Sequence, residues 1–162
     1  MALFVAVHQP GKGHDDNVSA IAMVQADRLL VDKSDRTLIL FAGTKEIARY
    51  TSIRFGASPA GHKQFEGDEK TPEGTYFITG RNPKSRFHLS LQISYPNGAD
   101  EAFAAAHGRS AGGEIFIHGQ PNGTTGPVIE TDWTDGCIAV SNDEIDQIWH
   151  LVPDGAPITI RP

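Results

Sequence analysis

The chain has 162 residues, with 14 basic Lys and Arg side chains against 20 acidic Asp and Glu side chains, so its net charge is −6 at neutral pH. This length fits one domain, and the 39% of apolar residues is enough to build a core without disulfides. No apolar run approaches the ~20 residues that cross a bilayer, and an acidic chain is poorly suited to neutralising phosphates. We therefore expect neither a membrane span nor binding to nucleic acid.

The N-terminal part of the chain is the least informative. Residues 1–7 lack the basic region, the full-length apolar segment and the cleavage site of a secretory signal. Residues 11–17 are polar and glycine-rich, which is typical of a loop. We interpret residues 1–27 as an N-terminal extension of unassigned structure and residues 28–162 as the domain that carries the function.

From residue 29 onward, short runs rich in β-branched and aromatic residues alternate with turn residues, as in chains built of strands. The polar connection at 32–36 predicts that the first two strands form an antiparallel hairpin. Together the runs predict a mostly β domain. The eight runs are 29–31, 37–41, 47–55, 75–78, 88–94, 114–117, 138–140 and 158–160.

Two segments interrupt the strand pattern with helical signals. Residues 99–107 are alanine-rich, with Asp100 as a candidate N-cap and Gly108 at the position after the C-cap. Ser141 and Glu144 have the spacing of a capping box, and apolar residues at helical spacing follow them. We expect this second helix to pack its Ile and Trp side chains on the sheet.

The residues that could carry chemistry gather between positions 115 and 142. An apolar run ends in His118 and Gly119, and a turn delivers Cys137, the one cysteine of the chain, directly after Gly136. Cysteine catalysis needs a thiolate, an imidazole that exchanges the proton, and N–H groups that stabilise the oxyanion of the tetrahedral intermediate. A loop between adjacent strands could bring the two side chains together. A structural histidine and an inert core cysteine would leave the same pattern.

The pair His118-Gly119, followed by the Asp-Gly-Cys-Ile of residues 135–138, resembles the signature of the L,D-transpeptidase (YkuD) catalytic domain, a His-Gly followed by a Ser/Thr-x-Gly-Cys. Residues 30–38 are similar to the opening hairpin of that family, and residues 71–76 to its Thr-Pro-x-Gly-x-Tyr segment. The resemblance covers about residues 29–161. It implies a β-sandwich or barrel of short strands with one or two helices.

The resemblance also implies a cysteine enzyme that acts on the stem peptides of peptidoglycan. Cys137 would attack the carbonyl of the third residue of a tetrapeptide, release the terminal D-Ala and hold the acyl group as a thioester until an amine takes it. His118 would be the general base and acid, and the carbonyl of Gly119 would orient its imidazole. The amides of Gly136 and Cys137 would form the oxyanion hole.

Several expectations about partners follow from this resemblance and from the spacing of the histidines. We expect no cofactor and no metal, because the histidines lack the spacing of ligands. The family resemblance implies that carbapenems acylate the cysteine. It also implies a protein of the periplasm or cell envelope, where its substrate lies, and we expect a monomer.

The sequence departs from the commonest family pattern after the cysteine. Where most members have Gly-Cys-Ile-Arg, residues 136–139 read Gly-Cys-Ile-Ala, as in one branch of the family, so the usual basic residue is absent. The acceptor is therefore left open. If water instead of an amine takes the acyl group, the protein is an L,D-carboxypeptidase or amidase. If the cysteine does not react at all, the protein is a non-catalytic domain that binds the cell wall.

Five further residues are candidates for substrate binding. Lys63 and Arg86 could bind the carboxylates of diaminopimelate, although surface Lys and Arg side chains are usually solvated. Asp135 could bind an ammonium group, although an aspartate in a turn is often structural. His88 could point from its strand into the cleft, and Trp133 could line the substrate groove.

Overall fold

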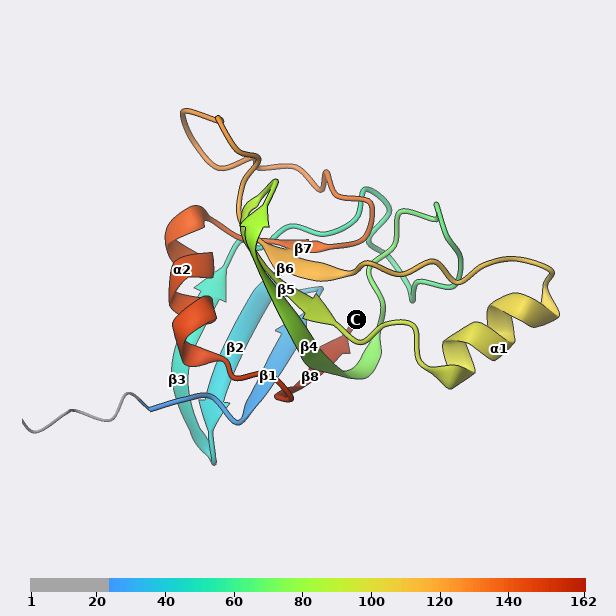
Figure 1. The fold of residues 1–162 in the computed structure, drawn as a ribbon, viewed down its shortest axis with the longest axis horizontal. Coiled ribbons are helices and arrows are strands. Elements are labelled where there is room, and N and C mark those ends of the chain that lie inside the picture. Colours follow the sequence, from blue (N-terminus) through green and yellow to red (C-terminus); the bar gives the residue numbers. More distant parts are fainter. Residues whose placement is uncertain (1–23) are drawn as a thin grey trace, which may run out of the picture.

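The structure is a computed structural model that describes residues 24–162. Eight strands and two helices follow one another along these residues (Figure 1). The predictions for residues 1–7 and 11–17 concern a part of the chain outside the described residues. The elements are β1 (Arg28–Asp32), β2 (Thr37–Ala42), β3 (Lys45–Thr51), β4 (Gly74–Ser85), β5 (His88–Ile93), α1 (Gly98–Ala106), β6 (Phe116–His118), β7 (Ile138–Ala139), α2 (Asn142–Leu151) and β8 (Pro157–Arg161).

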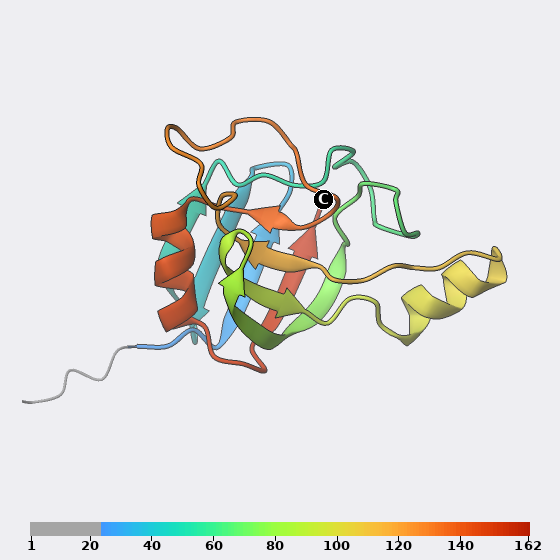
Figure 2. The ribbon, with the colours of Figure 1, turned by 45° about the horizontal axis from the view of Figure 1, so that its top comes forward.

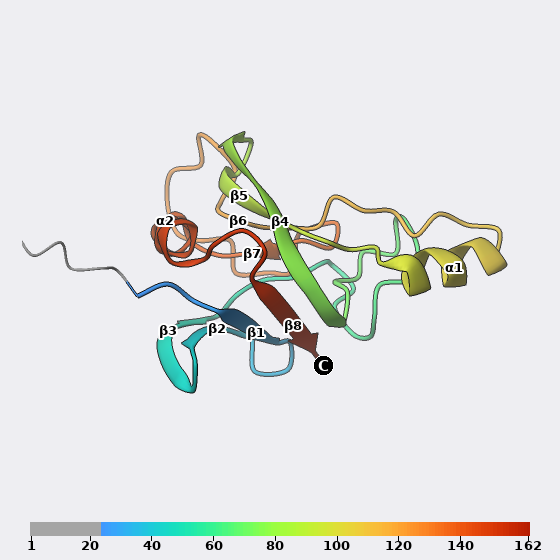
Figure 3. The same ribbon diagram turned by 60° about the horizontal axis from the view of Figure 1, so that its bottom comes forward.

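The strands form one sheet in the order β3-β2-β1-β8-β4-β5-β6-β7. β1 and β2 pair antiparallel, as the polar connection between them predicts. β4 is long enough to pair with β8 through its first residues and with β5 through its later ones, so it joins two layers of strands (Figure 3). A bridge between Arg54 and Ala139 links the edge strand β7 to the segment after β3, at the opposite edge. The prediction of a mostly β, sandwich-like or barrel-like domain is confirmed.

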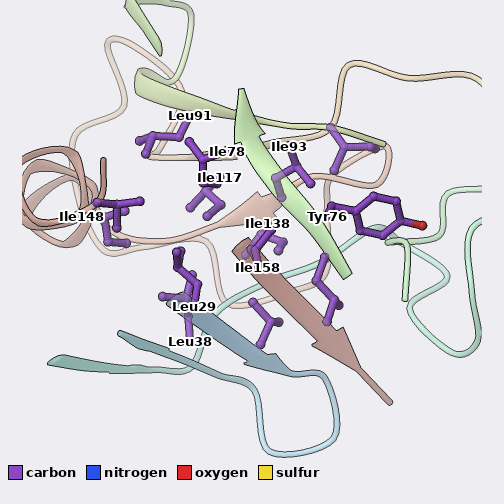
Figure 4. Close-up of a cluster of buried hydrophobic side chains, with 14 of the residues drawn as sticks. Leu29, Leu38, Tyr76, Ile78, Leu91, Ile93, Ile117, Ile138, Ile148 and Ile158 are labelled. Carbon is purple, nitrogen blue, oxygen red and sulfur yellow. The ribbon is translucent and has the colours of Figure 1, made fainter. Parts of the chain in front are cut away.

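The core lies between these two layers and is built from the inward-facing residues of nearly every strand. Leu29, Leu38, Ile117 and Ile158 are among the buried side chains that meet there (Figure 4). Full burial of a Leu or Ile side chain contributes roughly 1.5–3 kcal/mol relative to its exposure to water. The core therefore fixes the positions of β6 and β7, whose outer faces carry the candidate site.

Helix α2 begins as the sequence predicts. The Ser141 hydroxyl accepts a hydrogen bond from the Glu144 N–H at 3.2 Å, and the Glu144 carboxylate accepts one from the Ser141 N–H at 2.8 Å. Ile145 and Ile148 are fully buried against the sheet, and Trp149 is partly buried beside them. Within residues 24–162, neither helix has the length and apolar character needed to cross a membrane.

Helix α1 differs from the expectation in its first turn. Its N-cap is Asn97, whose side chain accepts hydrogen bonds from the N–H groups of Ala99 and Asp100. Asp100 completes a capping box by accepting a hydrogen bond from the Asn97 N–H, and its carboxylate also ties the helix to the rest of the domain by accepting one from the Tyr76 hydroxyl at 2.9 Å. α1 lies at the end of an arm that extends from the strands (Figure 2).

Two strands differ from their predicted bounds by more than two residues at one end. β4 continues to Ser85 although residues 79–84 are largely polar, because its backbone pairs with β5 while the side chains face solvent. β3 ends at Thr51, because Ser52 has a φ of 61° and cannot continue an extended strand. The longer β4 matters for function, since the hairpin that it forms with β5 reaches the candidate site.

Candidate active site

β6 and β7 bring the predicted cysteine and histidine to one face of the sheet. These strands pair in parallel, with Ile117 opposite Ile138 and His118 opposite Ala139. Ile117 and Ile138 are fully buried in the core. Because side chains alternate along a strand, His118 and Cys137 both project from the opposite face.

On that face lies a cavity of about 950 Å³. It is lined by both predicted catalytic side chains, so residues that are 19 positions apart in the sequence share one pocket. Four of the five candidate substrate-binding residues also line it. These are Lys63, Arg86, Trp133 and Asp135.

The environment of His118 fixes its orientation and its charge. Its Nδ1 lies 2.8 Å from the carbonyl oxygen of Gly119, and its ring stacks on Phe87 at 4.4 Å between centroids, with the Trp133 ring edge-on at 5.6 Å. Burial lowers the pKa of His118 below its ordinary value, and the Gly119 carbonyl offsets only part of this effect. The imidazole is therefore neutral at neutral pH, with its proton on Nδ1 and a lone pair on Nε2.

Gly119 lies where a larger residue would not fit. A Cβ there would lie 2.5 Å from Oδ1 of Asn142 and 3.0 Å from the carbonyl oxygen of Phe87. The same Asn142 oxygen accepts a hydrogen bond from the Gln120 N–H at 2.8 Å, so the first residue of α2 anchors the chain just after the histidine. The backbone of this segment can thus hold the imidazole in place.

Cys137 is half-buried, and its sulfur has two backbone partners. Sγ accepts a hydrogen bond from the Phe116 N–H at 3.4 Å and lies 3.5 Å from the Glu114 carbonyl oxygen, to which the thiol can donate. Burial raises the pKa of Cys137 to about 11, with further contributions from the carboxylates of Asp135 and Glu114, whereas the Phe116 N–H and the ammonium of Lys63 lower it. The resting cysteine is therefore a neutral thiol.

The turn before Cys137 is shaped by the hydroxyl of Thr134, a role that sequence reasoning missed. Its Oγ1 donates to the Cys137 carbonyl at 2.7 Å and accepts from the Gly136 N–H at 3.1 Å. The amide predicted to contribute to the oxyanion hole from Gly136 is thus already engaged. Across residues 24–162, no acceptor takes the N–H of Cys137, which leaves this amide as the available donor of the predicted pair.

A second structural contact missed by sequence reasoning holds the segment that leads into the turn. The guanidinium of Arg36 makes two hydrogen bonds of 2.7 Å to the carboxylate of Asp132, which also accepts from the Phe55 N–H at 3.0 Å. The pKa of Asp132 is lowered, chiefly by Arg36. The two charged residues are 96 positions apart, so no local motif signals the pair.

The structure places His88 and Lys63 differently from the expectations. His88 does not line the cavity, because Nε2 of its imidazole lies 2.8 Å from Asp146 on α2. Lys63 lines the cavity but is not a solvated surface residue: it is 3% exposed and pairs with Asp68 at 2.9 Å. Asp135 is exposed at the cavity, as a substrate-binding residue needs to be. No cluster of three or more potential metal ligands occurs within the described part of the chain.

A layered β domain whose strands β6 and β7 bring a cysteine and a histidine into one cavity defines the class of protein, and comparison with known families identifies that class. The chain belongs to the YkuD family of L,D-transpeptidase catalytic domains, which it matches over residues 26–160. The prediction of the family from the histidine and cysteine motifs is confirmed.

Individual relatives are also similar to this chain. YafK of Escherichia coli (strain K12) is 31% identical over 126 residues, which cover 74% of this chain and 44% of YafK. The crystal structure of the helical cell shape determining protein Pgp2 from Campylobacter jejuni matches with a TM-score of 0.66 at 26% identity, over 86% of this chain and 48% of that one. Bd1075 of Bdellovibrio bacteriovorus matches with a TM-score of 0.58 at 28% identity, over 85% and 48%. The chain thus spans about half the length of these relatives.

Proposed function

We propose that this domain transfers the acyl group of a peptidoglycan stem tetrapeptide to an amine through a thioester on Cys137. One observation carries the proposal: His118 at the end of β6 and Cys137 directly before β7 line the same cavity in a chain of the L,D-transpeptidase family. The substrate class comes from the family. The location that we propose, the cell envelope, follows because peptidoglycan lies outside the cytoplasmic membrane.

The acylation step starts from two neutral groups. As the sulfur attacks the carbonyl carbon of the third residue, the thiol proton passes to Nε2 of His118, and the developing oxyanion accepts a hydrogen bond from the Cys137 N–H. Collapse of the intermediate breaks the C–N bond to the terminal D-Ala, whose nitrogen takes the proton from the imidazolium. General acid–base assistance of this kind contributes roughly 10²- to 10⁴-fold to a rate.

Deacylation repeats these steps in reverse with a new nucleophile. The acceptor amine attacks the thioester carbonyl and gives its proton to His118, and the thiolate leaves and recovers a proton from the imidazolium. The cavity carries both signs of charge, with Lys84 and Arg86 on the β4–β5 hairpin and Glu114 and Asp135 beside the sulfur. This distribution supports a substrate that carries carboxylate and ammonium groups together, as a stem peptide does.

The product identifies the reaction. Incubation of the protein with disaccharide tetrapeptide should yield a 3→3 cross-linked dimer, or an exchange product with an added D-amino acid, detected by mass. Cys137→Ser should abolish both products, because a hydroxyl is far less acidic than a thiol and the site offers one imidazole to activate it. His118→Ala should be nearly as damaging, and both variants should keep the wild-type circular dichroism spectrum.

Other outcomes of the same experiment support the remaining hypotheses. Free tripeptide without dimer would indicate hydrolysis and hence an L,D-carboxypeptidase. The sequence is compatible with this alternative, because Ala139 stands where most family members have an arginine. An intact protein that gains no mass from a carbapenem and releases no D-Ala would indicate a wall-binding domain. Turnover that survives Cys137→Ser would contradict the thioester.

A further inference from the structure

A buried ammonium group forms part of the wall of the active-site cavity. Lys63 is 3% exposed and lines the same cavity as Cys137. A buried charge is costly unless it is paired, and Nζ of Lys63 lies 2.9 Å from Asp68 and 3.0 Å from the Phe65 carbonyl oxygen. Because Asp68 already occupies the position of a carboxylate partner, binding of a substrate carboxylate is not the role that this geometry favours for Lys63.

The pair formed by Lys63 and Asp68 closes the loop of residues 63–70. Besides the ammonium, the Asp68 carboxylate accepts hydrogen bonds from the N–H groups of Gln64, Phe65 and Lys70 at 2.8 to 3.1 Å. Burial acts to raise the pKa of Asp68, but these hydrogen bonds outweigh burial and lower it. The carboxylate therefore stays charged and the loop has one defined shape.

This loop supports the turn that carries the cysteine. A Cβ at Gly136 would lie 2.7 Å from the carbonyl oxygen of Lys70, and one at Gly56 would lie 2.1 Å from the carbonyl oxygen of Glu69 and 3.1 Å from Cα of Gly136. The loop and the turn are in direct backbone contact at these positions. A change in the loop would therefore be transmitted to Cys137.

The charge of Lys63 also acts on the sulfur. The carboxylates of Asp135 and Glu114 disfavour ionisation of Cys137, whereas the ammonium of Lys63 favours it. As the ammonium is almost completely buried, water screens its field only weakly. Lys63 thus offsets part of the effect of the two carboxylates on the pKa of the thiol, and so favours the step in which the thiol loses its proton.

We propose that Lys63 is a positioning residue for the nucleophile, which holds the loop of residues 63–70 against the Gly136–Cys137 turn through Asp68 and stabilises negative charge on the sulfur. This inference rests on the proposed function, in which Cys137 is acylated. It assigns to Lys63 an action on the nucleophile in place of contact with the substrate.

The pH dependence of cysteine alkylation tests the proposal without requiring turnover. The rate of modification of Cys137 by iodoacetamide follows the thiolate fraction, so the rate plotted against pH has its midpoint at the pKa of the thiol. In Lys63→Met this midpoint should rise by about 0.5 to 1 pH unit. Lys63→Arg keeps the charge and should restore most of the wild-type profile. Lys45→Met, an exposed lysine on the edge strand β3, is the matched control and should leave the profile unchanged.

Removal of Lys63 alone leaves the carboxylate of Asp68 without its ammonium, which can unfold the loop. The double variant Lys63→Met/Asp68→Asn removes both charges and keeps an oxygen that accepts the backbone N–H groups. Its alkylation midpoint should also rise, and its kcat should fall at least tenfold with KM little changed. A folded single or double variant with the wild-type alkylation profile and kcat would overturn the role of Lys63. Failure of the proposed function itself would be seen in a different experiment, as turnover that persists in Cys137→Ser.

Discussion

The Nδ1 atom of His118 lies 2.8 Å from the carbonyl oxygen of Gly119, the next residue along the chain. A carbonyl oxygen can only accept, so the contact requires a proton on Nδ1 and leaves Nε2 unprotonated in the neutral ring. In a Ser-His-Asp triad, a carboxylate performs this orienting task. Because a neutral carbonyl replaces the carboxylate, an imidazolium at His118 receives less electrostatic stabilisation.

The pH profile of kcat/KM should reflect this arrangement. The pKa of His118 is lowered from its ordinary value of 6.5. The unprotonated imidazole, which catalysis needs as a base, therefore remains the main form at pH 6.5. We expect the acidic limb of the profile to have its midpoint below 6.5. Initial rates measured across the acidic range in buffers of constant ionic strength would check this. A midpoint above 6.5 would contradict the lowered pKa of His118 and the buried environment that causes it.

Replacement of Thr134 by valine should damage the turn before the nucleophile. The change keeps the shape of the side chain but removes the hydrogen bonds to the Cys137 carbonyl and from the Gly136 N–H. We expect a loss of about 1–3 kcal/mol in the free energy of unfolding and a kcat at least tenfold lower. Thr134→Ser, which keeps the hydroxyl, should remain close to the wild type in both. Thermal unfolding and steady-state kinetics measure the two effects, and an unchanged kcat in the valine variant would show that the turn does not depend on this hydroxyl.

The sequence predicted most of the fold because its signals are local. All eight strands occur where β-branched runs predicted them, and the capping box of Ser141 and Glu144 begins α2. One error was a missed local signal. Asn97 and Asp100 form a capping box, so Asn97 caps α1 and Asp100 is the third residue of the helix, where it also accepts a hydrogen bond from Tyr76. The polar end of β4 has no hydrophobic alternation and is held by backbone pairing with β5.

The candidate site was predictable only in its motif residues. His118 and Cys137 precede and follow recognisable glycines, and this pattern singled them out. The residues around them lack such a signal: Phe87 stacks on the imidazole from a different hairpin, and Arg36 reaches Asp132 across 96 positions. A single sequence does not show which distant side chains will meet, because the sheet order decides it.

Asp135→Asn should make Cys137 more reactive in the free protein. The Asp135 carboxylate is one of the groups that raise the pKa of the thiol to about 11, so its removal lowers that pKa and increases the thiolate fraction at a given pH. Since Asp135 is exposed, we expect a modest gain in the alkylation rate near pH 8, roughly two- to fivefold at low salt, and a smaller gain at high salt. Asp35→Asn, an exposed change outside the cavity, is the control. An equal rate in Asp135→Asn and the wild type would contradict the electrostatic effect.

A comparison of Gly136→Ala with Gly43→Ala should separate backbone strain from steric conflict at the nucleophile. Both glycines have positive φ, +135° at Gly136 and +59° at Gly43, so alanine is strained at either position. A Cβ at Gly43 meets nothing within 4 Å, whereas one at Gly136 would lie 2.7 Å from the carbonyl oxygen of Lys70. We expect Gly43→Ala to cost about 1–2 kcal/mol of stability with an unchanged kcat.

Gly136→Ala should cost more than Gly43→Ala and should also lower kcat at least a hundredfold, because the turn can accept a Cβ only by moving Cys137 away from the loop of residues 63–70. Chemical denaturation would measure the stabilities, and carbapenem acylation followed by mass would report on the nucleophile independently of the acceptor. Equal losses of stability in the two variants, with acylation of Gly136→Ala at the wild-type rate, would show that contact with Lys70 does not constrain the turn. A slow acylation confined to Gly136→Ala would instead tie the reactivity of the cysteine to the backbone position that this glycine allows.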